Sequence, residues 1–245
     1  MFARNDADLA LVDLSPNITD LAEEIESEAR ARGQSIHVTA HECDVTIKSN
    51  VDEIFREIKL KHTKHKAANV IVNSAGIAIN KSFIEISEAD YDRLVAINVK
   101  GTYLVTHAAL NALVSEFPNF KFENDIQTYA SIINFSAMIA RTGMQGMSIN
   151  SLTKSSILGF TQSLAKELAT YRVRVNSVLP YFVETPMTMN QINEAKERIL
   201  KAACPIGRLS KPEEIGQAIL FLASDQSSYV SGGSYEISGG FNYFD

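Results

Sequence analysis

Carboxylates and small polar residues stand where several apolar runs end, and they could bind a ligand there. Asp13 ends the first run, Asp44 and Val45 follow the second, and Asn73-Ser74-Ala75-Gly76 close the third. A carboxylate at the end of a parallel strand can hydrogen-bond both ribose hydroxyls of an adenosine. Small residues let the backbone approach a flat ligand, and we expect Gly76 to use the positive φ that glycine tolerates. The pattern predicts a ligand crevice at these strand ends.

A tight turn explains each of these motifs equally well when it is considered alone. Asp13 precedes Ser15-Pro16, a typical turn sequence. The repetition of these motifs at successive strand ends favours a ligand site over simple turns, because the crevice of an open α/β sheet lies at the carboxyl ends of its strands. Leu14 follows Asp13, and no adjacent cation is present for a 2′-phosphate. This favours NAD over NADP.

The elements that must position these residues alternate between apolar runs and helical patterns. Strands that are apolar throughout and alternate with helices indicate a parallel sheet covered on both faces. We therefore predict one doubly wound α/β domain over residues 1–245. The predicted strands are Ala7–Asp13, Ile36–Ala40, Asn69–Asn73, Ser131–Phe135, Val173–Leu179 and Ser234–Ile237, and the predicted helices are Ile18–Ala31, Val51–Lys59, one around Tyr91, Asn98–Val114, Ile149–Leu168 and Pro212–Ala223. The polar stretch Glu116–Thr128 is predicted to be an exposed loop.

Charge and composition exclude several classes of protein. The chain has 245 residues with 23 Lys and Arg against 29 Asp and Glu, a net charge of -6, so no basic excess favours nucleic acid or an anionic membrane. No run approaches the roughly 18 apolar residues of a membrane span, and no targeting segment is visible. Cys43 and Cys204 are too few for a disulfide framework. The five histidines lack metal-ligand spacing, and His62 with His65 is expected at an exposed helix end, so we predict no metal.

Ordered motifs along nearly the whole chain resemble the short-chain dehydrogenase/reductase family. Beyond the strand ends described above, they are Ile97–Thr102, Ser151–Lys154, Val175–Pro180, Glu184–Met187, Val230–Gly232 and Gly239–Gly240. The chain is most similar to the branch that holds 17-beta-hydroxysteroid dehydrogenase type 8 and 3-oxoacyl-[acyl-carrier-protein] reductase. The resemblance implies a Rossmann-like fold and hydride transfer between a nicotinamide and a carbonyl or alcohol.

The resemblance also implies roles for individual residues. Lys154 matches the lysine that lowers the pKa of a catalytic Tyr and holds the nicotinamide ribose, and Asn98 matches the asparagine that supports a proton-relay water. The cofactor-binding positions that it implies are Asp13, Asp44, Val45, Asn73, Ala75, Gly76, Lys154, Pro180, Val183 and Thr185.

The sequence departs from the family at both positions that handle the substrate oxygen. Asn150 stands four residues before Lys154, where the family has its Tyr, and a carboxamide has no ionisable proton near neutral pH. Ala137 stands where the family has a Ser. Ser136 is adjacent, but successive residues leaving a strand point in different directions. The resemblance therefore predicts impaired catalysis.

Two further departures concern the cofactor. Phe2–Asp8 resembles the end of the family's first helix, so the first strand, its glycine-rich turn and most of that helix, about 25 to 30 residues, have no counterpart. We expect a gap between the strands that end at Asp13 and Asn73, and weakened or lost cofactor binding. Tyr181 replaces a family glycine beside the nicotinamide. It would narrow the pocket, occupy part of the cofactor's place or supply a phenol.

Three hypotheses follow. The chain is an NAD(P)-dependent oxidoreductase of 3-oxoacyl thioesters or hydroxysteroids with impaired activity, or a silent subunit that assembles with an active homologue, or a truncated gene product. The resemblance implies a homo- or hetero-oligomer through the long helices that begin at Asn98 and Ile149, and a mitochondrial or cytoplasmic location.

Overall fold

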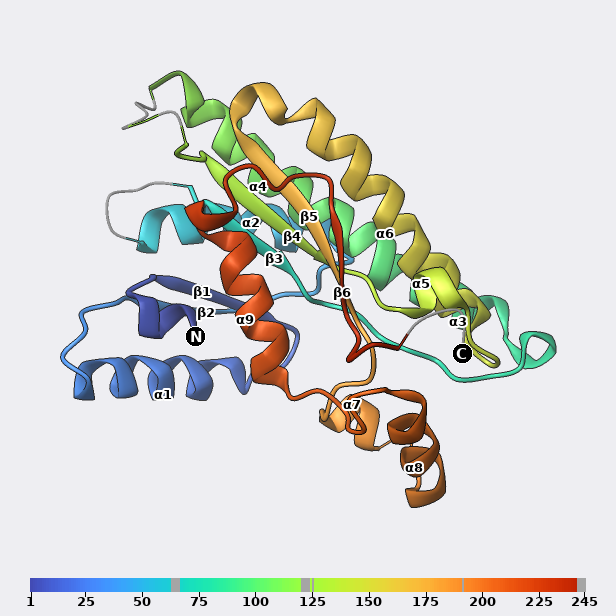
Figure 1. Ribbon diagram of the computed structural model, residues 1–245. Helices are drawn as coiled ribbons and strands as arrows, with labels where there is room; N and C mark the ends of the chain where they lie inside the picture. The colour runs from blue at the N-terminus through green and yellow to red at the C-terminus, as the bar shows by residue number, and fades with distance from the viewer. Residues whose placement is uncertain (63–66, 120–123, 125, 191, 242–245) are drawn as a thin grey trace.

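A parallel, twisted sheet flanked by helices organises the protein (Figure 1). The computed structural model describes residues 1–62, 67–119, 124, 126–190 and 192–241. Every strand pair in this part of the chain is parallel. The strands are β1 (Leu9–Asp13), β2 (Val38–Glu42), β3 (Val70–Asn73), β4 (Ala130–Phe135), β5 (Val173–Pro180) and β6 (Ser234–Ile237).

The sheet is divided into two parts. β1 pairs only with β2, whereas β3, β4, β5 and β6 form a second sheet in that order. The side chains of Val12 on β1 and Val72 on β3 are 37% and 36% exposed, which is unusual for strands of this apolar composition. The expected gap between the strands that end at Asp13 and Asn73 is therefore present in the structure.

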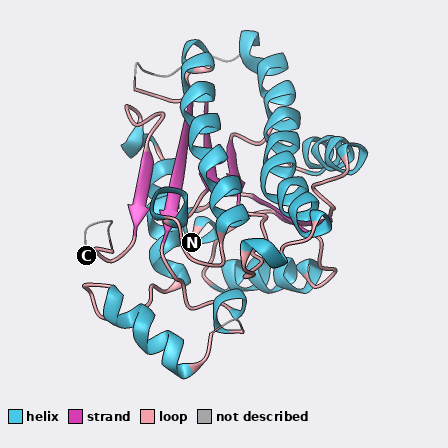
Figure 2. Ribbon diagram, turned by 90° about the vertical axis from the view of Figure 1, so that its right-hand side faces the viewer, coloured by secondary structure: helices cyan, strands magenta, loops and turns pink. Residues whose placement is uncertain are grey.

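Helices cover both faces of the strands, as doubly wound folds require (Figures 1 and 2). The first face carries α1 (Ile18–Ala31) and α9 (Pro212–Ala223). The opposite face carries α2 (Lys48–Lys61), α4 (Thr102–Glu116) and α6 (Ser148–Glu167), with α2 packed beside α4. The periodicity predicted each of these helices to within a few residues.

The core consists of two layers on either side of β4. Ile132 and Ile133 are both fully buried, and successive strand residues point to opposite faces. Ile132 joins the cluster with Leu113 under α4, whereas Ile133 joins the cluster with Ile215 under α9. This explains why almost every residue of β4 and β5 is buried, instead of buried and exposed residues alternating.

The N-terminal residues link the two parts of the sheet. Phe2–Asn5 form a 3₁₀ helix before β1. Phe2 packs against the cluster of Ile133 and Ile215, and the Met1 side chain lies against Gly216 on α9. These contacts hold the β1–β2 part against the main sheet.

Several short elements were not predicted from the sequence. The segment predicted as one helix from Asn98 begins as a π-helix, Ala96–Gly101, between α3 (Glu88–Val95) and α4. The others are α5 (Ile139–Thr142), α7 (Pro186–Met189) and α8 (Glu194–Ala203), with 3₁₀ turns at Phe83–Glu85, Phe117–Asn119, Ala169–Tyr171 and Asp225–Ser227. Much of the predicted Glu116–Thr128 loop lies outside the described residues, although α4 extends to Glu116. In the described part, no helix is both long and apolar enough to cross a bilayer.

Candidate active site

Lys154, Asn98 and Gly76 meet at the carboxyl ends of β3 and β4. The Lys154 ammonium on α6 donates to the carbonyl of Phe135, the last residue of β4, at 3.0 Å. A Cβ on Gly76 would lie 3.2 Å from Asn98 Oδ1 and 3.5 Å from Lys154 Nζ. Gly76 does not have the positive φ that we expected. A glycine suits this position because the backbone passes so close to two polar side chains.

Burial changes the pKa of Lys154. Removal from water disfavours the charged amine and lowers the pKa of Lys154 from 10.5 to about 8. No charged group among the described residues offsets this effect of burial. Strong perturbation at strand ends is typical of functional lysines.

Asn98 is held inside the π-helix with its side chain 1% exposed. Its Oδ1 accepts the N–H of Ile77 at 2.9 Å, and its Nδ2 donates to the carbonyl of Ile77 at 3.0 Å and to Thr153 Oγ1 at 3.2 Å. The Asn98 carbonyl accepts the Thr102 hydroxyl at 2.9 Å. Asn98 therefore fixes the chain that leaves β3.

Neither of the two positions expected to handle the substrate oxygen presents a hydroxyl. Asn150 is 2% exposed, and its carboxamide exchanges two hydrogen bonds with the backbone of Ile79. Ser136, beside Ala137, is also buried, and its hydroxyl donates to the carbonyl of Lys154 at 2.8 Å. Ser136 is thus committed to the α6 backbone and does not replace the missing serine.

Asp13, Asp44 and Asn73, at the ends of β1, β2 and β3, each have hydrogen-bond partners within the protein. Asp13 Oδ1 accepts the N–H of Ser15 at 2.8 Å. Asp44 Oδ1 accepts the N–H and hydroxyl of Thr46 at 2.9 and 2.7 Å, which lowers the pKa of Asp44. Asn73 Nδ2 donates inside the core to Thr106 Oγ1 at 2.9 Å and to Asn134 Oδ1 at 2.8 Å. The turn interpretation therefore holds for Asp13 and Asp44, and their ligand role remains a prediction.

The predicted cofactor residues Pro180, Val183 and Thr185 lie at the end of β5 and just after it. The buried Pro180 accepts the N–H of Met138 at 3.0 Å, and Val183 forms a bridge with Ser210. Thr185 caps α7 through its hydroxyl. Of the remaining predicted positions, Ala75 is exposed, and Val45 packs toward Gly101.

Comparison with known proteins places the fold in a family. The profile of a family described as enoyl-(acyl carrier protein) reductase matches residues 1–242. A 3-oxoacyl-[acyl-carrier-protein] reductase of Thermotoga maritima is 34% identical over 241 residues, which cover 98% of this chain and 89% of that protein. The chain belongs to the short-chain dehydrogenase/reductase family.

Other members of the short-chain dehydrogenase/reductase family extend the comparison. A (3R)-3-hydroxyacyl-CoA dehydrogenase of Mus musculus is 40% identical over 172 residues, which cover 70% of this chain and 62% of the mouse protein. The crystal structure of 3-ketoacyl-(acyl-carrier-protein) reductase from Brucella melitensis complexed with NADH superposes with a TM-score of 0.82 at 25% identity, covering 98% of this chain and 89% of that one. The match thus spans less than two thirds of the mouse relative's length.

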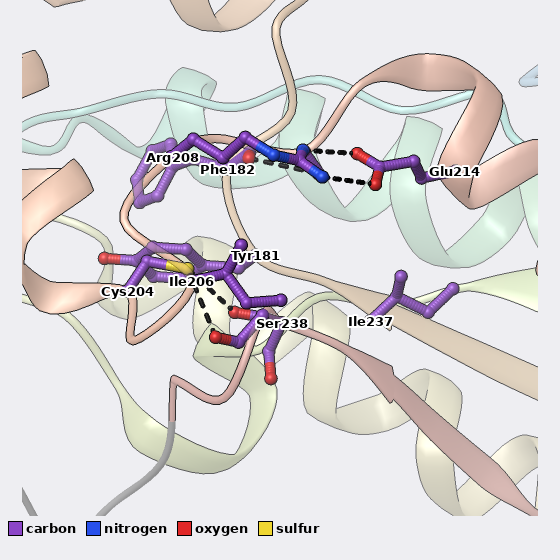
Figure 3. Close-up of a pocket in the computed structure, with 10 residues that line it drawn as sticks. Tyr181, Phe182, Cys204, Ile206, Arg208, Glu214, Ile237 and Ser238 are labelled. Atoms are coloured by element: carbon purple, nitrogen blue, oxygen red, sulfur yellow. Dashed lines mark hydrogen bonds and ion pairs between the residues drawn. The ribbon is translucent and has the colours of Figure 1, made fainter.

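Tyr181 does not join the lysine site. Its ring stacks on Phe241 with a 4.1 Å centroid separation and lines a cavity of about 120 Å³ with Cys204 and Ile206 (Figure 3). Burial, with the adjacent Cys204, raises the pKa of the Tyr181 phenol. The lining of this cavity includes neither Lys154 nor Asn98. The alternative in which Tyr181 supplies a phenol beside the lysine therefore receives no support from its contacts.

Two clusters were missed by sequence reasoning. Thr39 Oγ1 bonds the Nε2 atoms of His41 and His62 at 2.9 and 2.8 Å, so His62 is partly buried instead of exposed as expected. His65 lies outside the described residues. The described ranges hold no group of three His, Cys, Asp or Glu side chains placed for a metal ion. The second cluster consists of Asn98 and Asn150, whose carboxamides bond the backbone of Ile77 and Ile79. No sequence motif indicated these contacts.

Proposed function

We propose that this chain is a nicotinamide-dinucleotide-binding subunit of the short-chain reductase type in which proton transfer is lost. The reaction that it would no longer complete is hydride transfer to or from a 3-oxoacyl thioester or a hydroxysteroid, and the cofactor that it would bind is NAD in preference to NADP. The observation that carries this proposal is the Asn150 carboxamide, which is buried and bonded to Ile79 instead of facing a substrate.

The donor set fits the two ends of the cofactor. Asp13 Oδ1 bonds a neighbouring backbone N–H, and the exposed carboxylate can accept ribose hydroxyls through its second oxygen. Leu14 and Ile47 are 64% and 45% exposed at the same strand ends and offer apolar surface to an adenine. Lys154 beside Gly76 suits the nicotinamide ribose.

The described residues supply no glycine-rich turn for the pyrophosphate at the centre of the cofactor. We therefore expect the two ends to carry the binding. When bound, the nicotinamide would supply or accept the hydride.

Proton transfer is the step that these residues cannot support efficiently. Asn150 has no ionisable proton, and Ala137 cannot hydrogen-bond a substrate oxygen. Lys154 remains the ionisable group at the site, and it already donates to Phe135. General acid catalysis typically contributes about 10²- to 10⁴-fold, so we expect its loss to impair turnover.

The test is oxidation of NADH in the presence of acetoacetyl-CoA or a steroid ketone. We expect no ketone-dependent oxidation above background for the natural chain, and at least about a tenfold gain for the Asn150→Tyr/Ala137→Ser double variant. The matched control is Ser136→Ala, which changes a hydroxyl that faces α6. Ketone-dependent turnover by the natural chain at the rate of the double variant would contradict the proposal.

A second candidate function is assembly with an active homologue. Tyr103 on α4 and Leu152 on α6 are each 49% exposed, and Val114 is 37% exposed, so both long helices present apolar surface. Light scattering of the natural chain and of Leu152→Lys tests this function. A natural chain that is monomeric alone and in the presence of a related reductase would contradict it.

A further inference from the structure

The chain that leaves β3 is held by two carboxamides at alternate residues. Ile77 N–H donates to Asn98 Oδ1 at 2.9 Å, and Asn98 Nδ2 donates to the Ile77 carbonyl at 3.0 Å. Ile79 N–H donates to Asn150 Oδ1 at 3.0 Å, and Asn150 Nδ2 donates to the Ile79 carbonyl at 2.6 Å. Each carboxamide thus satisfies both polar groups of one residue, as a neighbouring β-strand would.

A third bond continues the same alternation. The N–H of Lys81 donates to the carbonyl of Gly146, just before α6, at 3.0 Å. A Cβ on Gly146 would lie 2.5 Å from Asn80 Oδ1, so the two segments are in close contact. We call residues 77–81 the strap, because successive odd-numbered residues tie it to the π-helix, to α6 and to the loop before α6.

The strap covers the position where a reacting oxygen would be handled. Asn150 beneath it is 2% exposed and Asn98 is 1% exposed. Gly76, one residue before the strap, lies beside Lys154 Nζ. Displacement of the strap would admit water to Asn150 and would move the chain that continues into Gly76, beside the Lys154 amine.

We propose that Asn150 is a positioning residue that latches the strap over the crevice and shields the Lys154 amine from water. This inference goes beyond the proposed function, because it holds whether or not the chain turns over a ketone. The proposal also explains why residue 150 is an asparagine. An apolar side chain would leave two buried backbone groups of Ile79 unpaired, and an ionised Asp could not donate to the carbonyl.

Amide hydrogen exchange of the full chain tests the latch. Asn150→Ala should accelerate exchange at Ile79 by about tenfold, the effect of one lost hydrogen bond. Asn150→Leu keeps a similar side-chain volume but forms no hydrogen bond, so it should accelerate exchange at Ile79 as Asn150→Ala does. Ser151→Ala is the matched control, because the buried Ser151 hydroxyl has no hydrogen-bond partner in the described part of the chain. Protection factors, which correct for intrinsic exchange, are compared among the variants.

A second readout separates the latch from a merely structural asparagine. NMR of ¹³C-methylated lysines reports the titration of Lys154, which should move from about 8 toward its usual range of about 10.5 in Asn150→Ala and stay in place in Ser151→Ala. Unchanged exchange at Ile79 in Asn150→Ala or Asn150→Leu would overturn the latch. Faster exchange with an unmoved Lys154 titration would overturn the shielding. If Asn150→Ala does not fold, Asn150→Leu carries both tests.

Discussion

Replacement of Thr39 by valine removes a hydroxyl that joins two histidines between β2 and α2. Thr39 is 9% exposed, and its Oγ1 lies 2.9 Å from His41 Nε2 and 2.8 Å from His62 Nε2. His41 Nδ1 lies 3.3 Å from the Glu57 carboxylate, so that nitrogen carries the proton in the neutral ring. The Thr39 hydroxyl then donates to His41 and accepts from His62.

The magnitude follows from the burial of the two rings. His41 is 3% exposed, so its Nε2 would lose the partner that the described residues give it, in a place that water does not readily reach. A buried polar group left unpaired costs about 1 to 3 kcal/mol. His62 lies at the end of α2 and is only partly buried, so water can replace most of its bond. Because valine fills nearly the same volume as threonine, we expect a loss of about 2 kcal/mol in unfolding free energy.

Thermal and urea unfolding at pH 7.5 measure this loss. For a chain of this size, about 2 kcal/mol corresponds to a Tm decrease of about 4 to 8 °C. Thr46→Val is a useful comparison, because the Thr46 hydroxyl donates to Asp44 in a partly exposed turn where solvent can substitute. An unfolding free energy for Thr39→Val within about 0.5 kcal/mol of the natural chain would refute the reasoning.

Three further predictions concern protonation and packing. Burial lowers the pKa values of His41 and His62 below 6.5, Lys61 adds to the effect at His41 and Glu57 opposes it. The unfolded chain therefore binds more protons than the folded chain. The free energy of urea unfolding should fall as the pH drops from about 7 toward 5, and it should fall less steeply in His41→Gln. An unfolding free energy that does not depend on pH would contradict this prediction. Reductive methylation of Lys154 should rise with a midpoint near pH 8, about two units below the surface lysines, and a midpoint near 10.5 would show that the amine is solvated. Gly101→Ala would place a Cβ 2.8 Å from Val45 Cγ2 and should lower the free energy of chemical unfolding by about 1 to 3 kcal/mol. Adding Val45→Ala should restore most of this loss. Additive effects of the two changes would contradict the contact.

The sequence predicted the main elements because their signals are local and repeated. The strands are rich in apolar residues, and the bounds Ile18–Ala31, Pro212–Ala223 and Ser234–Ile237 agree with the structure. At Pro212 the signal is strong, since a proline begins the helix and Glu213 and Glu214 follow it in the first turn. The gap in the sheet was also predicted, from the resemblance to a family.

The contacts of the site could not be predicted in the same way. Asn150 was identified as a departure from the family, but its pairing with Ile79 joins residues 71 positions apart and depends on the path of an extended segment. The π-helix before α4 was missed, because its sequence has no periodicity that distinguishes it from an α-helix. His62 was misjudged for a similar reason, since its partner Thr39 lies on another element.

The most direct test of the account is one titration of NADH fluorescence against the natural chain and Lys154→Ala, followed by addition of acetoacetyl-CoA to the same samples. The account predicts saturable NADH binding by the natural chain, at least tenfold weaker binding by the variant (about 1.4 kcal/mol), and no ketone-dependent oxidation in either sample. A folded natural chain that binds no NADH, or one that oxidises NADH when the ketone is added, would contradict it.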